Sequence, residues 1–164
     1  LLTNKVDLAF IERSTGAKEI ISKDIWTDEL VFISSTEHNW REKEYLEVAD
    51  LQDNVFIIRE SGSGTRERFE EFLESQGITV NSTIELSHLE AILNYVKLNM
   101  GVSCVPYMSV IREERLHSLK VYRLKGHELN RSLFCAIHRD KYISVPIKCF
   151  MDFCEEFDMF NSKS

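Results

Sequence analysis

The chain has 164 residues, 43% of them hydrophobic and 29% charged, so it is long enough to bury a core and is not a disordered segment. Its longest apolar runs are strand-sized, well short of the roughly 18 residues that span a bilayer, and its N-terminus lacks a secretory signal. The net charge is −7 with acids interspersed among the cations, which argues against free-standing DNA binding because phosphate neutralisation needs a concentrated basic surface.

The first third of the chain predicts strands and a connection. Residues 6–11 form a short apolar run that indicates a buried strand. Residues 20–26 and 29–33 are β-rich stretches, separated either by a turn or by a bend within one long strand. Residues 34–50 are polar and turn-rich, and they predict a connecting segment. The expected apolar anchors of this region are Leu46, Val48 and Leu51.

Strands and helices then alternate. An apolar strand at residues 55–58 leads through a loop rich in serine and glycine into a helix, in which Phe69, Phe72 and Leu73 recur at helical spacing. Gly77 closes this helix as a left-handed cap. Alternating apolar residues between positions 79 and 86 predict a strand with one covered face. A second helix begins near Ser87. Its expected apolar stripe is Leu89, Ile92, Leu93, Val96 and Met100.

The last part of the chain continues this alternation. Gly101 is expected to end the second helix before a buried strand at residues 102–105, which Pro106 terminates. A short helix at 107–115 and strands at 119–124 and 133–137 follow. The final helix has Ser144 as its cap, Pro146 in its first turn, and an inner face of Ile147, Phe150, Met151, Cys154 and Phe157. The alternation indicates an α/β fold with a mostly parallel sheet.

The cysteines and histidines do not suggest a metal site. All four cysteines, Cys104, Cys135, Cys149 and Cys154, are expected to be buried thiols, which indicates a reducing compartment and therefore the cytoplasm. No C-x-x-C pair is present, and the five histidines show no ligand spacing. We expect neither a metal nor a cofactor.

The loop Ser61-Gly62-Ser63-Gly64-Thr65 is the most informative stretch. Its glycines allow a close approach by a ligand, its three hydroxyls add donors, and the helix N-terminus after it carries unpaired N–H groups and a partial positive charge. These properties suit a small anion. The alternative is that Ser63 or Thr65 only caps the helix. The nucleotide motifs G-x-x-x-x-G-K-[ST] and G-x-G-x-x-G are absent.

The order of several segments resembles the effector-binding domain of LysR-type transcriptional regulators. The resemblance covers nearly the whole chain and continues downstream of the loop into a helix-glycine-strand-proline segment. The matching segments are Val6-Asp7-Leu8-Ala9-Phe10, residues 26–33, Asp50-Leu51, residues 56–66, Glu90-Ala91-Ile92, Val96, Gly101-Val102 and Pro106.

This resemblance implies a fold similar to type 2 periplasmic binding proteins, with two Rossmann-like α/β lobes joined by two crossing strands. Lobe I would comprise residues 1–32 and 131–164, and lobe II residues 33–130, with hinge strands near 30–33 and 131–137. The family's first strand and helix would lie upstream of this chain. So would the helix-turn-helix domain through which such regulators contact DNA.

The resemblance also implies an effector site in the cleft between the lobes. Ser61, Gly62, Ser63, Gly64 and Thr65 would line its second-lobe side, and Glu12 its first-lobe side, although Glu12 also fits a solvated loop acid. Ser87 would lie near the effector or cap its helix, His88 is expected to be exposed, and Pro106 would end its strand near the cleft. Arg66 would pair with a ligand carboxylate or, alternatively, with Glu70 at i+4.

We therefore expect a sensor of a small anionic metabolite that assembles as a homodimer or tetramer. The alternative is a solute-binding protein for transport, which shares the fold. An enzyme is not expected, because the sequence has no G-x-S-x-G elbow and no recognised acid/base pattern.

Overall fold

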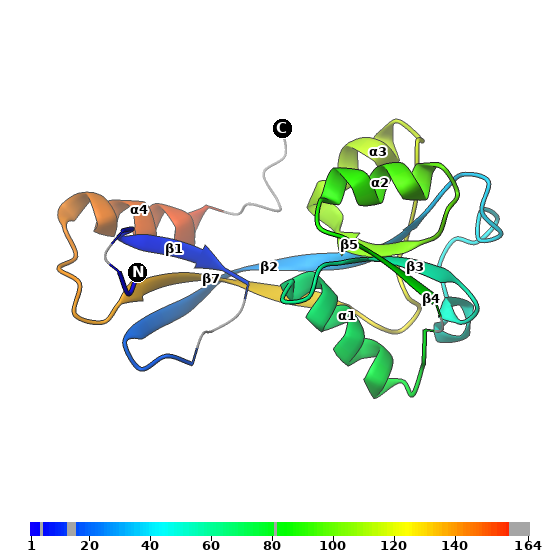
Figure 1. Cartoon of the computed structure of the whole chain (residues 1–164). Helices are drawn as coiled ribbons and strands as arrows, with labels where there is room; N and C mark the ends of the chain where they lie inside the picture. The colour runs from blue at the N-terminus through cyan, green and yellow to red at the C-terminus, as the bar shows by residue number, and fades with distance from the viewer. Residues whose placement is uncertain (4, 13–15, 81, 158–164) are drawn as a thin grey trace. The chain divides into compact units, whose positions relative to one another are not determined.

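A computed structural model describes residues 1–3, 5–12, 16–80 and 82–157 of the chain (Figure 1). The chain forms two compact units. Unit 1 consists of Leu1–Asp28 and Arg131–Ser164, and unit 2 of Glu29–Asn130. Both units combine strands with helices, as expected for an α/β protein.

Unit 1 is built on strands β1, Leu8–Ile11, and β7, Asn130–His138, which pair in antiparallel fashion. Strand β2, Ile20–Ser34, is the other neighbour of β7 in the sheet and continues into unit 2. The two β-rich stretches predicted before residue 34 therefore form one long strand. Helix α4, Val145–Glu156, follows β7.

The expectation that residues 6–11 form a buried strand is wrong in its burial. Strand β1 lies at the end of the described strand order, with β7 as its paired neighbour. Its residues are half-buried or exposed, and the Phe10 side chain is 44% exposed. An apolar run reports hydrophobic character but not whether both faces of the strand are covered.

Unit 2 contains a second group of strands and helices. The β3–β4 pair is parallel, with α1 as its crossover helix, whereas β5 and β6 each pair with β2 in antiparallel fashion. The elements are η1 Val48–Leu51, β3 Val55–Arg59, α1 Gly64–Ser75, β4 Ser82–Leu86, α2 Leu89–Lys97, β5 Ser103–Pro106, η2 Tyr107–Ser109, α3 Ile111–Arg115 and β6 Lys120–Tyr122.

The predicted mostly parallel sheet is therefore wrong. Every strand register described for β1, β2, β5, β6 and β7 is antiparallel, and β3–β4 is the parallel pair. Two strands joined by a helix are parallel when they are neighbours in the sheet. The long strand β2, however, is antiparallel to its neighbours β5 and β6. The alternation of element types does not reveal which strands become neighbours.

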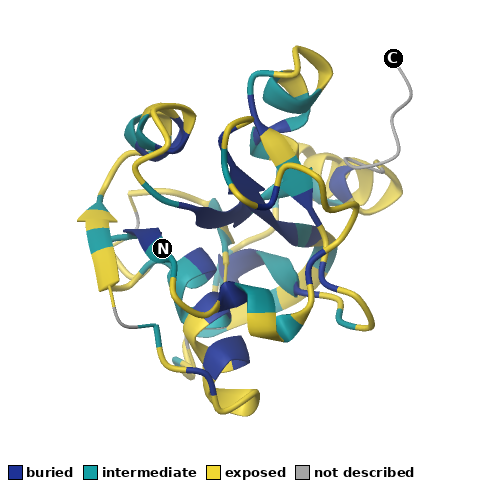
Figure 2. Cartoon of the chain, turned by 90° about the vertical axis from the view of Figure 1, so that its right-hand side faces the viewer, coloured by how far each residue is buried: buried dark blue, intermediate teal, exposed yellow. Residues whose placement is uncertain are grey.

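The core of unit 2 lies on both faces of its strands (Figure 2). Along β2, Leu30 and Phe32 belong to one hydrophobic cluster, and Val31 and Ile33 belong to the other. This division follows the two-residue period of a strand. The first cluster includes α1 residues and the second α2 residues, so helices cover opposite faces. The expected anchors Leu46 and Leu51 are fully buried in the first cluster, and Val48 packs against it.

The ends of α1 and α2 only partly match the sequence. Gly77 follows the C-cap residue Gln76 of α1 with a φ of +66°, and its N–H bonds to the Glu74 carbonyl, which confirms the predicted cap. Helix α2 ends at Lys97, and Asn99 takes the left-handed conformation with a φ of 57°. The expectation that Gly101 caps α2 is wrong, as is the placement of Met100 on its buried stripe, because Met100 is 47% exposed.

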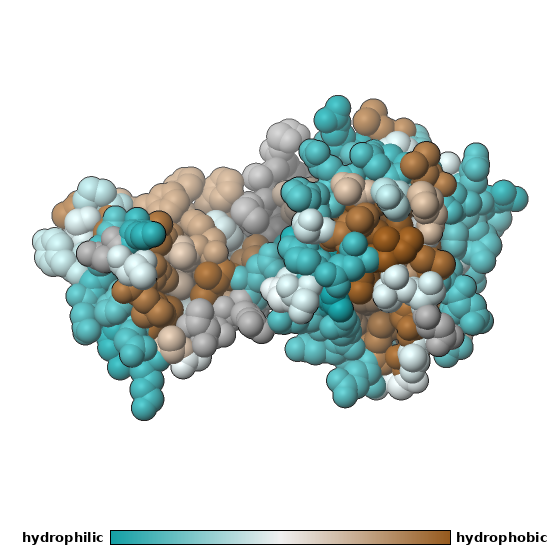
Figure 3. Space-filling model, in the orientation of Figure 1, coloured by the Kyte–Doolittle hydropathy of each residue, from teal (hydrophilic) through white to brown (hydrophobic). Residues whose placement is uncertain are grey.

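Helix α4 begins as predicted, with Ser144 at the N-cap position and a proline in the first turn. Cys154 is buried, and the Phe150 ring meets Phe10 of β1 edge-on with ring centroids 6.2 Å apart, although Phe150 remains 47% exposed. Phe157, just beyond the helix, is 39% exposed. Hydrophobic residues consequently gather on the visible surface of unit 1 (Figure 3). Cys149 is also exposed, which corrects the expectation of four buried thiols.

Candidate functional site

The carboxyl ends of three strands of unit 2, β3, β4 and β5, lie side by side. Strands β3 and β4 are parallel with Arg59 opposite Leu86, so the next residues, Glu60 and Ser87, leave the sheet together. A parallel bridge joins Phe56 to Val102, and Pro106 lies four residues beyond Val102, as Glu60 lies four beyond Phe56. The carboxyl ends of β3, β4 and β5 therefore meet at one edge, hereafter the site edge.

A helix begins at each of these strand ends. Ser63, His88 and Pro106 occupy the N-cap positions of α1, α2 and η2, respectively. The first turns of these helices have N–H groups without partners inside the helix, and the two α-helices add the positive ends of their dipoles. The site edge thus collects backbone donors suited to an anion.

The predicted loop forms the turn between β3 and α1. Gly62 has a φ of +87°, a conformation that glycine adopts without strain, and the Ser63 N–H bonds to the Glu60 carbonyl at 3.2 Å. Ser61 and Gly62 are exposed, Ser63 and Gly64 are half-buried, and Thr65 is buried.

The alternative that these hydroxyls merely cap α1 receives limited support. Ser63 is at the N-cap position, but its side chain makes no cap hydrogen bond. Thr65 lies one residue inside the helix, with a side chain that is 3% exposed. The Ser63 hydroxyl is therefore not committed to the cap and can donate to a ligand.

Charged side chains beside the loop are already paired. Arg59 donates from Nε and Nη2 to the two carboxylate oxygens of Glu60, each at 2.8 Å. This hydrogen bonding lowers the pKa of Glu60 to about 2. Because the Arg59 charge offsets that of Glu60, the acid presents less repulsion to an anion than its position alone suggests.

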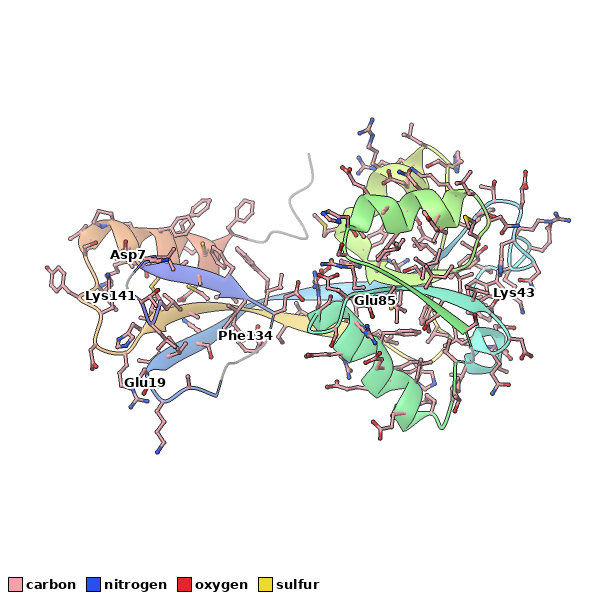
Figure 4. All side chains as sticks on the ribbon, viewed as in Figure 1. Asp7, Glu19, Lys43, Glu85, Phe134 and Lys141 are labelled. Carbon is pink, nitrogen blue, oxygen red and sulfur yellow. The ribbon has the colours of Figure 1, made fainter. Side chains whose placement is uncertain are left out.

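Arg66 pairs with Glu70, as one of the two alternatives from the sequence predicted. Its guanidinium lies 2.7 Å from Glu70 and 2.6 Å from Glu85, the β4 residue labelled in Figure 4. Hydrogen bonds to Glu70 and then to Glu85 raise the pKa of Arg66. Glu70 was recognisable from its i+4 spacing, whereas Glu85 lies 19 positions away and has no local signal.

Ser87 and His88 lie where β4 gives way to α2. The expectation that Ser87 caps α2 is wrong, because His88 is the N-cap residue. The Ser87 Oγ lies 3.0 Å from His88 Nδ1, and both side chains are exposed. The expected exposure of His88 is confirmed.

A cation missed in the sequence lies near the β5 end of the site edge. Arg123 stacks over the Tyr107 ring at 4.9 Å and pairs with Glu29 at 2.7 Å. Glu29 precedes Leu30, which is opposite Pro106 in the β2–β5 register. A cavity of about 740 Å³ adjoins this pair, lined by Glu29, Arg123, Leu124, Gly126, His127, Glu128 and Asn130. Arg123 lies in a short strand and loop region without a recognisable motif.

Glu12 belongs to unit 1 and is not a simple solvated acid. Its Oε1 lies 2.7 Å from Nη1 of Arg131, whose guanidinium also binds Asp28 at 2.8 Å. The Glu12 side chain is 42% exposed. Sequence reasoning missed Arg131, because both partners lie more than a hundred positions earlier in the chain. The predicted role of Glu12 toward a ligand stays a prediction.

Residues 1–3, 5–12, 16–80 and 82–157, the part of the chain that the structure describes, lack both a metal-ligand cluster and a membrane-spanning helix. No group of three or more histidine, cysteine, aspartate or glutamate side chains in this part of the chain is arranged to hold a metal ion. None of the helices found there is both long and apolar enough to cross a membrane.

The chain resembles known transcriptional regulators in sequence. It is 33% identical over 156 residues to the uncharacterized HTH-type transcriptional regulator YeiE of Escherichia coli K12, covering 94% of this chain and 53% of YeiE. It is 28% identical to the HTH-type transcriptional activator CmpR of Synechocystis, covering 93% of this chain and 50% of CmpR. The chain thus spans about half the length of the curated relatives it matches.

Solved structures share the fold. The regulatory domain of Synechocystis CcmR in complex with 2-PG matches with a TM-score of 0.84 and 24% identity, covering 94% of this chain and 74% of that chain. The effector-binding domain of QuiR in complex with shikimate matches with a TM-score of 0.84 and 22% identity, covering 95% and 73%. These likenesses confirm the predicted type 2 periplasmic-binding-protein-like fold. The family model described as the LysR substrate binding domain matches residues 1–158, and the chain therefore belongs to the LysR substrate-binding domain family.

Proposed function

We propose that this effector-binding domain recognises a small anionic metabolite at the site edge of unit 2. The observation that carries the proposal is the convergence of three strand ends, each followed by a helix N-terminus, around the loop from Ser61 to Thr65. Backbone donors and the Ser63 hydroxyl would bind the anionic group. Shikimate, which the QuiR domain binds, is a carboxylate and illustrates the ligand class.

The proposed contacts are those predicted from the sequence. The anion would bind mainly to the loop Ser61-Gly62-Ser63-Gly64-Thr65. Ser87 and Pro106 would contribute from the neighbouring strand ends at the same edge. A contribution from Glu12 would add a carboxylate and would favour a ligand that also carries an ammonium group. An amino acid would offer both groups, a carboxylate for the loop and an ammonium for Glu12.

We further propose that the domain senses and does not catalyse. The relatives named above are transcriptional regulators, which supports regulation over both catalysis and the solute-transport alternative. In the whole protein, DNA contact would come from a helix-turn-helix domain outside this chain. The protein would act in the cytoplasm as a homodimer or tetramer, and light scattering after size exclusion tests that assembly.

The proposed mechanism is a shift between conformations. An effector changes such an equilibrium only by its difference in affinity for the two states. We propose that units 1 and 2 correspond to the two predicted lobes, with hinges near 30–33 and 131–137, and that the shift is transmitted to the DNA-binding domains.

A thermal-shift screen tests the site. Inorganic phosphate, shikimate and the common amino acids are suitable probes, because a bound ligand at one hundred times its Kd stabilises the fold by about 2.7 kcal/mol. Ser63→Ala with Thr65→Ala should abolish the shift for a probe that binds the wild type. Ser75→Ala, at the far end of α1, is the matched control and should retain the shift.

The buried position of Thr65 requires a second variant, Ser63→Ala alone, in which the buried side chain is intact. Far-UV circular dichroism checks that each variant folds. An unchanged ligand response in folded Ser63→Ala and in the double variant would place the binding site elsewhere.

A further inference from the structure

The chain passes between its two units twice, after Asp28 on β2 and before Arg131 on β7. These two boundary residues are bound to each other. Arg131 donates to Oδ2 of Asp28 from Nε at 3.0 Å and from Nη2 at 2.8 Å. Because β2 and β7 are neighbours in the sheet, the pair ties the crossing strands together at the unit boundary.

The Asp28–Arg131 pair is largely withdrawn from water. Its side chains are 4% and 12% exposed, respectively. The adjacent residue Glu29 also pairs with an arginine, Arg123, but those side chains are 34% and 53% exposed. Exposed ion pairs contribute little, whereas loss of one partner from a buried pair leaves an uncompensated charge. Neighbouring positions on β2 thus carry the same chemistry in two different environments.

A third group joins this pair from the residue after β1. Glu12 directly follows β1, and its Oε1 lies 2.7 Å from Nη1 of Arg131. One guanidinium therefore connects the end of β1 to both crossing strands. Arg131 binds both Glu12 and Asp28. If Glu12 loses its charge or pairs with another group, the interaction of Arg131 with Asp28 therefore changes as well.

We propose that Arg131 is a positioning residue that fastens the two crossing strands to each other and makes their local stability depend on the state of Glu12. Through Arg131, neutralisation of Glu12 or its loss as an ion-pair partner increases the local unfolding of the crossing segments. The arrangement is a conformational coupling device within unit 1, at the points where the chain leaves it and returns to it. It does not require that Glu12 contact the effector, so it stands independently of the function proposed above.

Hydrogen–deuterium exchange measured by mass spectrometry tests the proposal in the whole chain. Peptides covering residues 24–32 and 129–134 report on the crossings, and peptides covering residues 55–58 report on the buried strand β3. Arg131→Gln and Asp28→Asn should each accelerate exchange of the crossing amides by about tenfold, with β3 unchanged. Glu12→Gln should accelerate the crossing amides by about threefold.

Glu29→Gln is the matched control and should change crossing exchange by less than about twofold, because its ion pair is exposed. Equal acceleration in β3 and in the crossings would indicate general destabilisation and overturn the positioning role. Unchanged crossing exchange in Arg131→Gln would also overturn it. If Arg131→Gln does not fold, Glu12→Gln decides, because its neutralised side chain is partly exposed, and unaltered crossing exchange in it would contradict the proposal.

Discussion

Gly101 approaches the backbone of Val55 so closely that a Cβ atom at Gly101 would lie 2.5 Å from the Val55 carbonyl oxygen. The same carbonyl accepts a 2.9 Å hydrogen bond from the N–H of Val102. The glycine is therefore required by the joining of the β5 segment to β3, and not by the end of α2. Backbone atoms cannot move aside as a flexible side chain can.

Gly101→Ala should destabilise unit 2 by about 3 kcal/mol, because the added methyl group forces the two strands apart. Urea unfolding followed by Trp40 fluorescence measures the effect, since Trp40 is buried in unit 2. Trp26→Phe, introduced into both the wild type and the Gly101→Ala variant, removes the fluorescence of the tryptophan in unit 1. Gly77→Ala, which meets nothing within 4 Å but has a φ of +66°, should cost only about 1 kcal/mol. Equal losses in the two variants would refute the packing explanation.

Ser103→Ala should lower the free energy of unfolding by about 1–2 kcal/mol. The Ser103 hydroxyl donates to the Ile57 carbonyl at 2.6 Å, and the residue is 1% exposed, so its loss removes a buried hydrogen bond between β5 and β3. The same Trp40 assay applies. Ser75→Ala is the exposed control, and a Ser103 variant as stable as that control would show that the bond contributes nothing.

The pKa of Glu60 should be measurable near 2 by NMR titration of its side-chain carboxyl carbon. A pKa depressed in the folded state means that ionised Glu60 favours folding fully above pH 4.5 and that this contribution disappears as the pH falls from 4.5 towards 2. Arg59→Gln should raise the midpoint because it removes the largest cause of the shift. A midpoint that does not move would mean that Arg59 does not bind Glu60 in solution.

Cys149 should react with a thiol reagent well before the other three cysteines. It is exposed, whereas Cys104, Cys135 and Cys154 are buried, and burial also raises the pKa of Cys135 and Cys154. Native protein at pH 8 should show one fast thiol by absorbance, and Cys149→Ser should remove that phase. A fast phase that persists in Cys149→Ser would contradict the described burial.

Local patterns were sufficient to place much of the candidate site. The apolar run before Arg59, the glycines at 62 and 64, and the helical spacing of Phe69, Phe72 and Leu73 predicted the strand, turn and helix that form it. These signals are readable because burial in a single element repeats with the period of that element. The left-handed conformation of Gly77 was readable for a similar reason, since its position just past the apolar stripe requires a helix stop.

Partners distant along the chain were decided only in three dimensions. The approach of Gly101 to Val55, the pairing of Arg66 with Glu85 and the joining of Glu12 and Asp28 to Arg131 all depend on which strands become neighbours. The antiparallel course of β2 and the exposure of Phe150 have the same origin. The sequence by itself determined the local elements and the chemistry of the loop, because those follow from short-range periodicity and conformational preference. The tertiary structure alone decided which charges, backbones and apolar faces meet, because that depends on the packing of segments far apart in the chain.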